Sequence, residues 1–312
     1  MPSEQHSSLQ HQPVLYQETI AALRPSPAGR YLDGTVGAGG HAFGILEATN
    51  PEGMLLGLDV DPQALSIAKE RLADFGKRAK LLKASYGQMT EICQAESFLP
   101  LEGILLDVGA SSIQFDRAER GFSFRKEGPL DMRFDPEATL SAEEIVNTWP
   151  EEQLADVIYR YGEERRSRRI ARAIVRARPI ASTKELASLI LSSLKAKRGS
   201  IHPATRTFQA LRITVNEELD TLERALPQAI ELLSSGGRLA VISFHSLEDR
   251  IVKQFMRRES QDCICPPEQL VCTCDHLASI NEIVRRPIRP QDTELDLNPR
   301  ARSARLRVAE KL

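Results

Sequence analysis

The chain has 312 residues, of which 41% are hydrophobic and 27% charged, with a formal net charge of −2. This is the composition of an ordinary globular protein, and it excludes a polycation that binds nucleic acid with its whole surface. No apolar run reaches the roughly 18–20 residues that a membrane span needs, and residues 1–12 lack the apolar centre of a secretory signal. We therefore expect no membrane span and a cytoplasmic location.

The first third of the chain alternates strand and helix patterns. A glycine-rich turn, Asp33-Gly-Thr-Val-Gly-Ala-Gly-Gly-His41, joins the first strand to the first helix. Glycine has no Cβ, so such a turn lets the backbone approach a ligand closely. Asp59 ends the second strand, where a carboxylate commonly binds ribose hydroxyls, whereas Asp61 before Pro62 is typical of a helix N-cap. The pattern predicts a parallel sheet that holds an adenosine-type cofactor, with strands at 30–36, 53–59, 79–83 and 103–108.

No strand pattern is found between residues 122 and 206. Helices are predicted there from Ser141, which opens a capping box, and over 151–161, 163–178 and 183–195. This stretch is interpreted as a helical insertion. One face of its third helix carries arginines that either bind phosphate or form a solvated surface: Arg165, Arg169, Arg172 and Arg176.

The α/β pattern returns with a helix over 217–233, a Gly236-Gly237 stop and a strand over 238–244. Weaker strands are predicted at 283–288 and 303–309. Of the five cysteines, Cys93 fits a helix core. The other four form two C-x-C pairs that could close a thiolate zinc site, although C-x₂₋₄-C is the usual spacing. Redox or incidental cysteines are the alternative, and no metal ligand is assigned among Cys263, Cys265, Cys272 and Cys274.

Two cofactors are compatible with the first turn. The dinucleotide motif G-x-G-x-x-G tolerates alanine at its last position, which is Ala42 here, so NAD is allowed. A polar loop after Asp107, at the end of the fourth strand, and a closing pair of strands favour S-adenosylmethionine (SAM). Methyl transfer mainly requires the acceptor to be placed in line with the sulfonium methyl group.

Ordered sequence blocks carry a more specific signal. The chain resembles the MraW/RsmH family of 16S rRNA (cytosine-N4) methyltransferases from about residue 11 to its C-terminus. The blocks are residues 33–41, Leu106-Asp-Val-Gly-Ala-Ser-Ser112, Glu119-Arg-Gly-Phe-Ser-Phe124, Gly128-Pro-Leu-Asp-Met-Arg133, Tyr161-Gly-Glu-Glu164, His202-Pro-Ala-Thr-Arg-Thr-Phe-Gln-Ala-Leu-Arg212, Ser243-Phe-His-Ser-Leu-Glu-Asp-Arg250 and Asn298-Pro-Arg-Ala-Arg302.

The resemblance implies an α/β fold with a class I SAM-dependent methyltransferase (Rossmann-like) sheet and an inserted all-helical domain. Residues 1–121 and 207–312 are expected to bind SAM, and 122–206 to recognise the substrate. The implied activity is SAM-dependent N4-methylation of a decoding-region cytidine in 16S rRNA of the small ribosomal subunit. The implied cofactor contacts are Gly39, Gly40, His41, Asp59, Tyr86, Asp107 and Gln114.

Cytosine N4 is a weak nucleophile, because its lone pair is conjugated with the ring. The base must be held by its edge while a group accepts a proton as the N–C bond forms. The sequence leaves that acceptor open. Asp107 is the best guess for a catalytic residue, but it is positioned either to bind SAM or to hydrogen-bond N4, and the sequence does not separate these two roles. Candidate substrate contacts are Ser111, Ser112, His202, Arg206 and His245, for which a salt-bridged structural network is the alternative. A nicotinamide dehydrogenase and a non-enzymatic ribosome-assembly factor are competing interpretations, and the sequence leaves the oligomeric state open.

Overall fold

The computed structural model describes residues 13–194, 202–269 and 271–312. The chain divides into two compact units. We call the first, Met1–Gly109 with Asp220–Leu312, the α/β unit, and the second, Ala110–Leu219, the helical unit.

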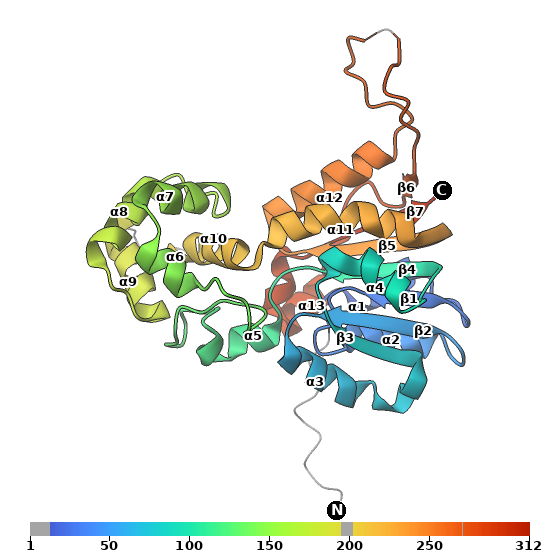
Figure 1. Ribbon diagram of the computed structural model, residues 1–312, viewed down its shortest axis with the longest axis horizontal. Coiled ribbons are helices and arrows are strands. Elements are labelled where there is room, and N and C mark those ends of the chain that lie inside the picture. Colours follow the sequence, from blue (N-terminus) through green and yellow to red (C-terminus); the bar gives the residue numbers. More distant parts are fainter. Residues whose placement is uncertain (1–12, 195–201, 270) are drawn as a thin grey trace, which may run out of the picture. The chain divides into compact units, whose positions relative to one another are not determined.

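A seven-stranded sheet forms the centre of the α/β unit, in the order β3-β2-β1-β4-β5-β7-β6 (Figure 1). The first five strands pair in parallel, whereas β7 is antiparallel to both of its neighbours. The strands are β1 (Arg30–Asp33), β2 (Met54–Asp59), β3 (Ala79–Lys83), β4 (Leu101–Asp107), β5 (Leu233–Ser243), β6 (Ile280–Glu282) and β7 (Arg305–Lys311).

Helices connect these strands. The α/β unit contains α1 (Tyr16–Leu23), α2 (Gly40–Ala48), α3 (Pro62–Arg71), α4 (Met89–Ala95), α11 (Glu218–Leu232, with its first two residues in the helical unit), α12 (Ser246–Glu259) and α13 (Asp292–Leu297). Short 3₁₀ turns are η1 (Ala73–Arg78), η2 (Tyr86–Gln88) and η4 (Pro299–Ser303).

The sheet is buried on both faces, because successive residues of a strand point to opposite sides. Leu32 and Leu56 pack in a cluster with α4, α11 and α12, whereas their neighbours Tyr31 and Leu55 pack in a second cluster with α1, α2 and α3. The apolar strand runs in the sequence therefore contribute to two cores at once.

The helical unit has a core of its own. It consists of α5 (Ser112–Asp116), η3 (Ala118–Arg120), α6 (Ala142–Thr148), α7 (Glu151–Arg160), α8 (Ser167–Ala177), α9 (Thr183–Leu194) and α10 (Ala204–Asn216). Its limits lie outside the predicted 122–206, because Ala110 and Phe115 at one end, and Phe208 and Leu211 at the other, pack in the same cluster. None of the described helices combines the length and the apolar character needed to cross a bilayer.

Most strand predictions agree with the structure to within a few residues, but the prediction at 283–288 is wrong. The strand lies at 280–282 instead, and beyond it only Ile288 forms a bridge, to Leu306. Pro287 has no amide hydrogen and cannot donate to a ladder, so a continuous strand over 283–288 is disfavoured. The predicted helix over 163–178 begins only at Ser167, since Glu163 adopts a positive φ of 49°.

Candidate cofactor site at the carboxyl ends of the strands

The glycine turn is fixed to the strands on either side of β1. The Gly34 amide donates to the Leu105 carbonyl of β4 (2.9 Å), and the Val36 amide donates to the Leu58 carbonyl of β2 (2.9 Å). Gly37 and Gly39 have φ values of +51° and +76°, a region that favours glycine. The turn thus crosses the carboxyl edge of three adjacent strands before α2 begins.

The predicted glycine contacts have different surroundings. A Cβ on Gly37 would find only a carbonyl oxygen at 3.8 Å, so the backbone is open there. A Cβ on Gly39 would lie 3.3 Å from Ala68 of α3, and one on Gly40 would clash with the Pro13 ring at 2.3 Å. Gly39 and Gly40 therefore also serve packing within the α/β unit, a role that the sequence did not suggest.

Asp59 holds the turn from the end of β2. Its Oδ2 accepts from the Gly37 amide (2.8 Å) and its Oδ1 from the Asp61 amide (2.9 Å). Burial raises the pKa of Asp59 to about 6, against the opposing effect of these amides. Asp61 accepts from the Gln63 amide (2.9 Å) with Pro62 at the first helical position, which confirms its prediction as a cap.

Two further acids lie at the ends of β1 and β4. Burial raises the pKa of Asp33 to about 7, with a contribution from the charge of Asp59. Burial, then the charges of Asp33 and Glu248, raise the pKa of Asp107 well above its ordinary value. Among the described residues, Asp33 Oδ2 and Asp107 Oδ1 are buried without a hydrogen-bond partner. Such atoms are rare unless a ligand or water completes them.

His41 lies beside Asp107. Its Nε2 is 3.6 Å from Asp107 Oδ2, and its ring stacks on Tyr16 with centroids 6.1 Å apart. Burial lowers the pKa of His41 to about 4, so the ring is neutral at pH 7 and the contact is not an ion pair. The neutral imidazole of His41 can therefore donate or accept a hydrogen bond at the carboxyl edge of the sheet.

Tyr86 begins η2, after β3. Its Cβ is close to the glycine turn, 2.9 Å from where a Cβ on Gly34 would lie, and the ring is half-buried against the core. Gln228 of α11 fixes this turn by donating to the Gly87 carbonyl (2.8 Å). Tyr86 therefore lies at the same carboxyl edge of the sheet as Asp33, Asp59 and Asp107.

His245 serves as the N-cap of α12. Its Nδ1 accepts from the Glu248 amide (3.4 Å), and Glu248 Oε2 accepts from the backbone amides of Phe244 and His245. Next to this capping box, Asp249 binds Arg305 and Arg307 of β7 (2.6 and 2.7 Å). Much of the block at 243–250 is therefore a structural network within the α/β unit.

The remaining predicted residues belong to the helical unit. Ser111 and Gln114 form a capping box at the start of α5, which begins with Ser112. His202 packs its ring on Phe124 (4.7 Å between centroids). Arg206 is exposed on α10 and lies 3.6 Å from Glu164. The structure brings Gly39, Gly40, His41, Asp59, Tyr86 and Asp107 together in one unit, and Ser111, Ser112, Gln114, His202 and Arg206 in the other.

Three contributors to this edge are not predicted by the sequence patterns. Asp33 ends β1 as Asp59 ends β2, and that shared position was the available signal. Thr35 accepts the Asp107 amide on its hydroxyl (2.6 Å) and so joins the turn to β4. Glu248 is the third residue after the helix cap His245. Because histidine is not among the preferred cap residues, the sequence does not indicate this capping box.

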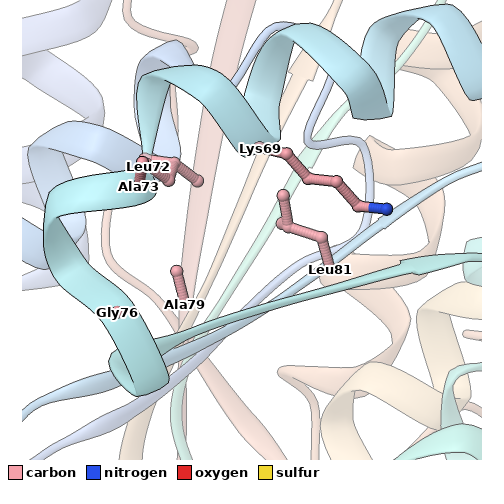
Figure 2. A pocket seen from close by; sticks show the side chains of 6 residues that line it. All are labelled: Lys69, Leu72, Ala73, Gly76, Ala79 and Leu81. Atoms are coloured by element: carbon pink, nitrogen blue, oxygen red, sulfur yellow. The ribbon is translucent and has the colours of Figure 1, made fainter.

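A pocket of about 180 Å³ elsewhere in the α/β unit does not contain this chemistry. It lies between α3, η1 and β3 and is lined by Lys69, Leu72, Ala73, Gly76, Ala79 and Leu81 (Figure 2). Lys69 is its single titratable residue, and Ala79 begins β3, so the pocket opens near the amino end of that strand.

Comparisons with known proteins identify the family of this chain. The MraW methylase family matches residues 8–312. A Ribosomal RNA small subunit methyltransferase H from Dehalococcoides mccartyi strain BAV1 is 53% identical, over 97% of this chain and 86% of that protein. Proteins of the same name from Syntrophus aciditrophicus (50%, 100% of both chains) and Lawsonia intracellularis (52%, 97% and 99%) are similar throughout. The chain therefore belongs to the MraW methylase family, and it is a SAM-dependent methyltransferase.

Proposed function

We propose that the protein methylates N4 of a specific cytidine in the decoding region of 16S rRNA, in the small ribosomal subunit. Full-length relatives named for small-subunit rRNA support the substrate class. The observation that carries the proposal is Asp107, a partly buried carboxylate at the end of β4 whose Oδ1 is buried and has no hydrogen-bond partner among the described residues.

The residues at the strand ends fit SAM. Asp59 accepts from the backbone amides of Gly37, Asp61 and Val60, which still leaves lone-pair capacity on its two oxygens for ribose hydroxyls. Gly37 exposes backbone beside it, and Tyr86 offers an aromatic face. In this proposal Gly39, Gly40, His41, Asp59, Tyr86, Asp107 and Gln114 hold the cofactor.

Charge favours the same ligand. Burial raises the pKa of Asp33, Asp59 and Asp107, and like charge adds to it, from Asp59 onto Asp33 and from Asp33 onto Asp107. A bound cation would favour their ionised forms, and SAM supplies a sulfonium-activated methyl group beside an ammonium. The three acids therefore give the site a preference for a cationic cofactor over the anionic dinucleotides.

The acceptor requires a group that takes its proton. The N4 lone pair forms the bond to the methyl carbon, the carbon–sulfur bond breaks with its electron pair left on sulfur, and N4 releases one proton. We assign that proton to Asp107, since an ionised carboxylate with a raised pKa is a better base than an ordinary one. Neutral His41 lies 3.6 Å from Asp107 Oδ2 and helps to hold the carboxyl group in place. Ser111, Ser112, His202, Arg206 and His245 are proposed to bind the RNA.

Methyl transfer from tritiated SAM to undermethylated small subunits tests the proposal, followed by nucleoside analysis of the labelled RNA. We expect label in N4-methylcytidine at one site. Label in another nucleoside, or none with either subunits or free 16S rRNA, would overturn it.

Asp107→Asn tests the assignment of the base. An amide cannot accept the proton, so turnover should fall by about 10²–10⁴-fold, a larger factor than the loss of SAM affinity that follows from the missing cofactor contact. Glu248→Gln is the matched control, because it removes a buried carboxylate near Asp107 and keeps an oxygen for the two backbone amides. Equal loss in both variants, or a loss confined to SAM affinity, would remove Asp107 from the role of base.

A further inference from the structure

The connection between α12 and β6 extends away from the sheet as a long excursion, residues 260–279 (Figure 1). Its described residues form no helix or strand. Apolar burial does not hold it, since Val271 and Leu277 are 72% and 76% exposed. A segment of this length without secondary structure needs another source of order.

Several hydrogen bonds close the base of the excursion, including the Ser279 hydroxyl to Glu259 Oε2 (3.2 Å) and His276 Nε2 with the Arg258 carbonyl (3.1 Å). The Ser279 amide donates to the Glu259 carbonyl (2.8 Å), and the Ala278 amide donates to Asp262 Oδ1 (3.3 Å). These contacts lie at the base of the excursion and do not reach its distal part, which holds both C-x-C pairs.

The four cysteine sulfurs of that distal part converge. Cys263 Sγ lies 3.5 Å from Cys272 Sγ and 3.8 Å from Cys274 Sγ, and the last two are 3.6 Å apart. Cys265 completes the group, and all four sulfurs lie within 4.8 Å of one another. Two residues from each side of the excursion thus meet at one point.

These separations are those of a tetrahedral thiolate site. Four sulfurs at about 2.3 Å from a central zinc lie about 3.8 Å apart along the edges of the tetrahedron. A disulfide joins only two sulfurs, at about 2.05 Å, and gives no reason for a second pair to converge on the first.

The backbone around the cluster is arranged symmetrically. The Ile264 amide, in the middle of the first C-x-C pair, points at Cys274 Sγ (3.4 Å). The Thr273 amide, in the middle of the second pair, points at Cys265 Sγ (3.5 Å). Amides directed at sulfur stabilise thiolates, which are the form that binds metal.

We infer that Cys263, Cys265, Cys272 and Cys274 bind one structural Zn²⁺. The four thiolates fill a tetrahedral shell and leave no open position for substrate or water, so the ion orders the excursion and takes no part in methyl transfer. This assignment stands on the sulfur geometry and is independent of the proposed methylation site.

Metal analysis of the full chain, purified without chelator, is the test. We expect about one zinc per chain after gel filtration. Cobalt exchanged for zinc should show the intense thiolate charge-transfer and visible bands of a tetrahedral sulfur site. Zinc well below one per chain with free thiols, iron in its place, or two disulfides in non-reducing mass spectrometry would each overturn the assignment.

Two variants locate the ion. Cys272→Ser with Cys274→Ser should lower the zinc content at least tenfold, whereas the matched control Cys93→Ala, in the core of α4, should keep it. Circular dichroism checks that the double variant folds. If it does not, the single variant Cys265→Ser must still lose charge-transfer intensity in cobalt form. Zinc retained by every cluster variant would contradict the proposal.

Discussion

Asp33 shows how a single buried residue sets pH dependence. Its folded pKa of about 7 lies above the ordinary value of 3.8, so the folded protein keeps a proton that the unfolded chain has lost. The sign is opposite to that of a salt-bridged aspartate: stability is full below about pH 4 and falls as pH rises towards 7. Asp33 therefore lowers the stability of the folded protein at neutral pH and above.

Asp33→Asn should therefore stabilise the protein at pH 8 and leave its stability at pH 4 unchanged. Asparagine retains an oxygen for the Thr35 amide but carries no buried charge. The expected gain is about 1–3 kcal/mol, discounted from the full pKa shift because water relaxes around a buried charge. Urea unfolding at both pH values measures it, and parallel pH profiles for the two proteins would contradict the argument.

Asp59 and Asp61 are two residues apart but have different tasks. Asp59→Ala should weaken SAM binding about ten- to a hundredfold, because it removes the ribose acceptor and the partner of the Gly37 amide. Asp61→Ala should cost about 1 kcal/mol of stability through the lost cap of α3. Calorimetric titration with SAM and urea unfolding of both variants separate the roles, and equal losses of affinity would refute the distinction.

At the scale of elements, α8 presents the clearest unassigned surface. Ile170, Ala171 and Ile174 are buried, while Arg169, Arg172 and Arg176 of the helix are exposed, as is Arg165 just before it. Over the part of the chain that the structure describes, Arg172 is the one member of this face in an ion pair, with Glu151. The other three arginines of this row form no ion pair with a carboxylate among the described residues, which suits the binding of phosphate.

Arg169→Glu should weaken rRNA binding and lower the slope of log affinity against log salt by about 0.7–0.9 for each phosphate that the variant no longer neutralises. Arg160→Glu on α7 is the control, since the same charge change there affects an arginine already paired with Asp156. Filter binding across a salt series gives both slopes, with SAM affinity as a check of integrity. Identical slopes would assign the α8 face to solvent.

Elements differ in how well the sequence predicts them. The strand at 79–83 and the cap at Asp61 depend on neighbouring residues, and both are found as predicted. Helices α10 and α12 are not predicted from the sequence. The first lies within a motif block, and the second begins after a histidine cap, which is not one of the preferred cap residues. The strand at 280–282 is defined by its pairing with β7, which is distant in sequence and adds no local pattern.

For the whole molecule, the sheet is assembled from segments that precede and follow the helical unit in the sequence. β4 pairs with β5 although more than a hundred residues separate them. A ligand bound at the strand ends therefore connects segments that are far apart along the chain.

SAM should accordingly stabilise the full chain. A ligand that binds only the folded state at a hundred times its Kd adds about 2.7 kcal/mol. We expect the melting temperature, measured by scanning calorimetry, to rise with the concentration of SAM. It should stay constant when NADH is added instead. A shift with NADH alone would contradict the cofactor assignment.

The sequence by itself determined the alternation of strands and helices, the glycine turn, the cap at Asp61 and the cofactor role expected of Asp59, because these depend on residues close together in the chain. The tertiary structure alone decided which groups meet. It placed Asp33 and Asp107 at the ends of two neighbouring strands and made His245 the N-cap of α12. It extended the helical unit to the residues that share its core. It also brought the four cysteine sulfurs within 4.8 Å of one another, whereas the spacing of the two C-x-C pairs alone did not decide whether they bind a metal. Convergence across the chain depends on strand order and packing, and no local pattern encodes either.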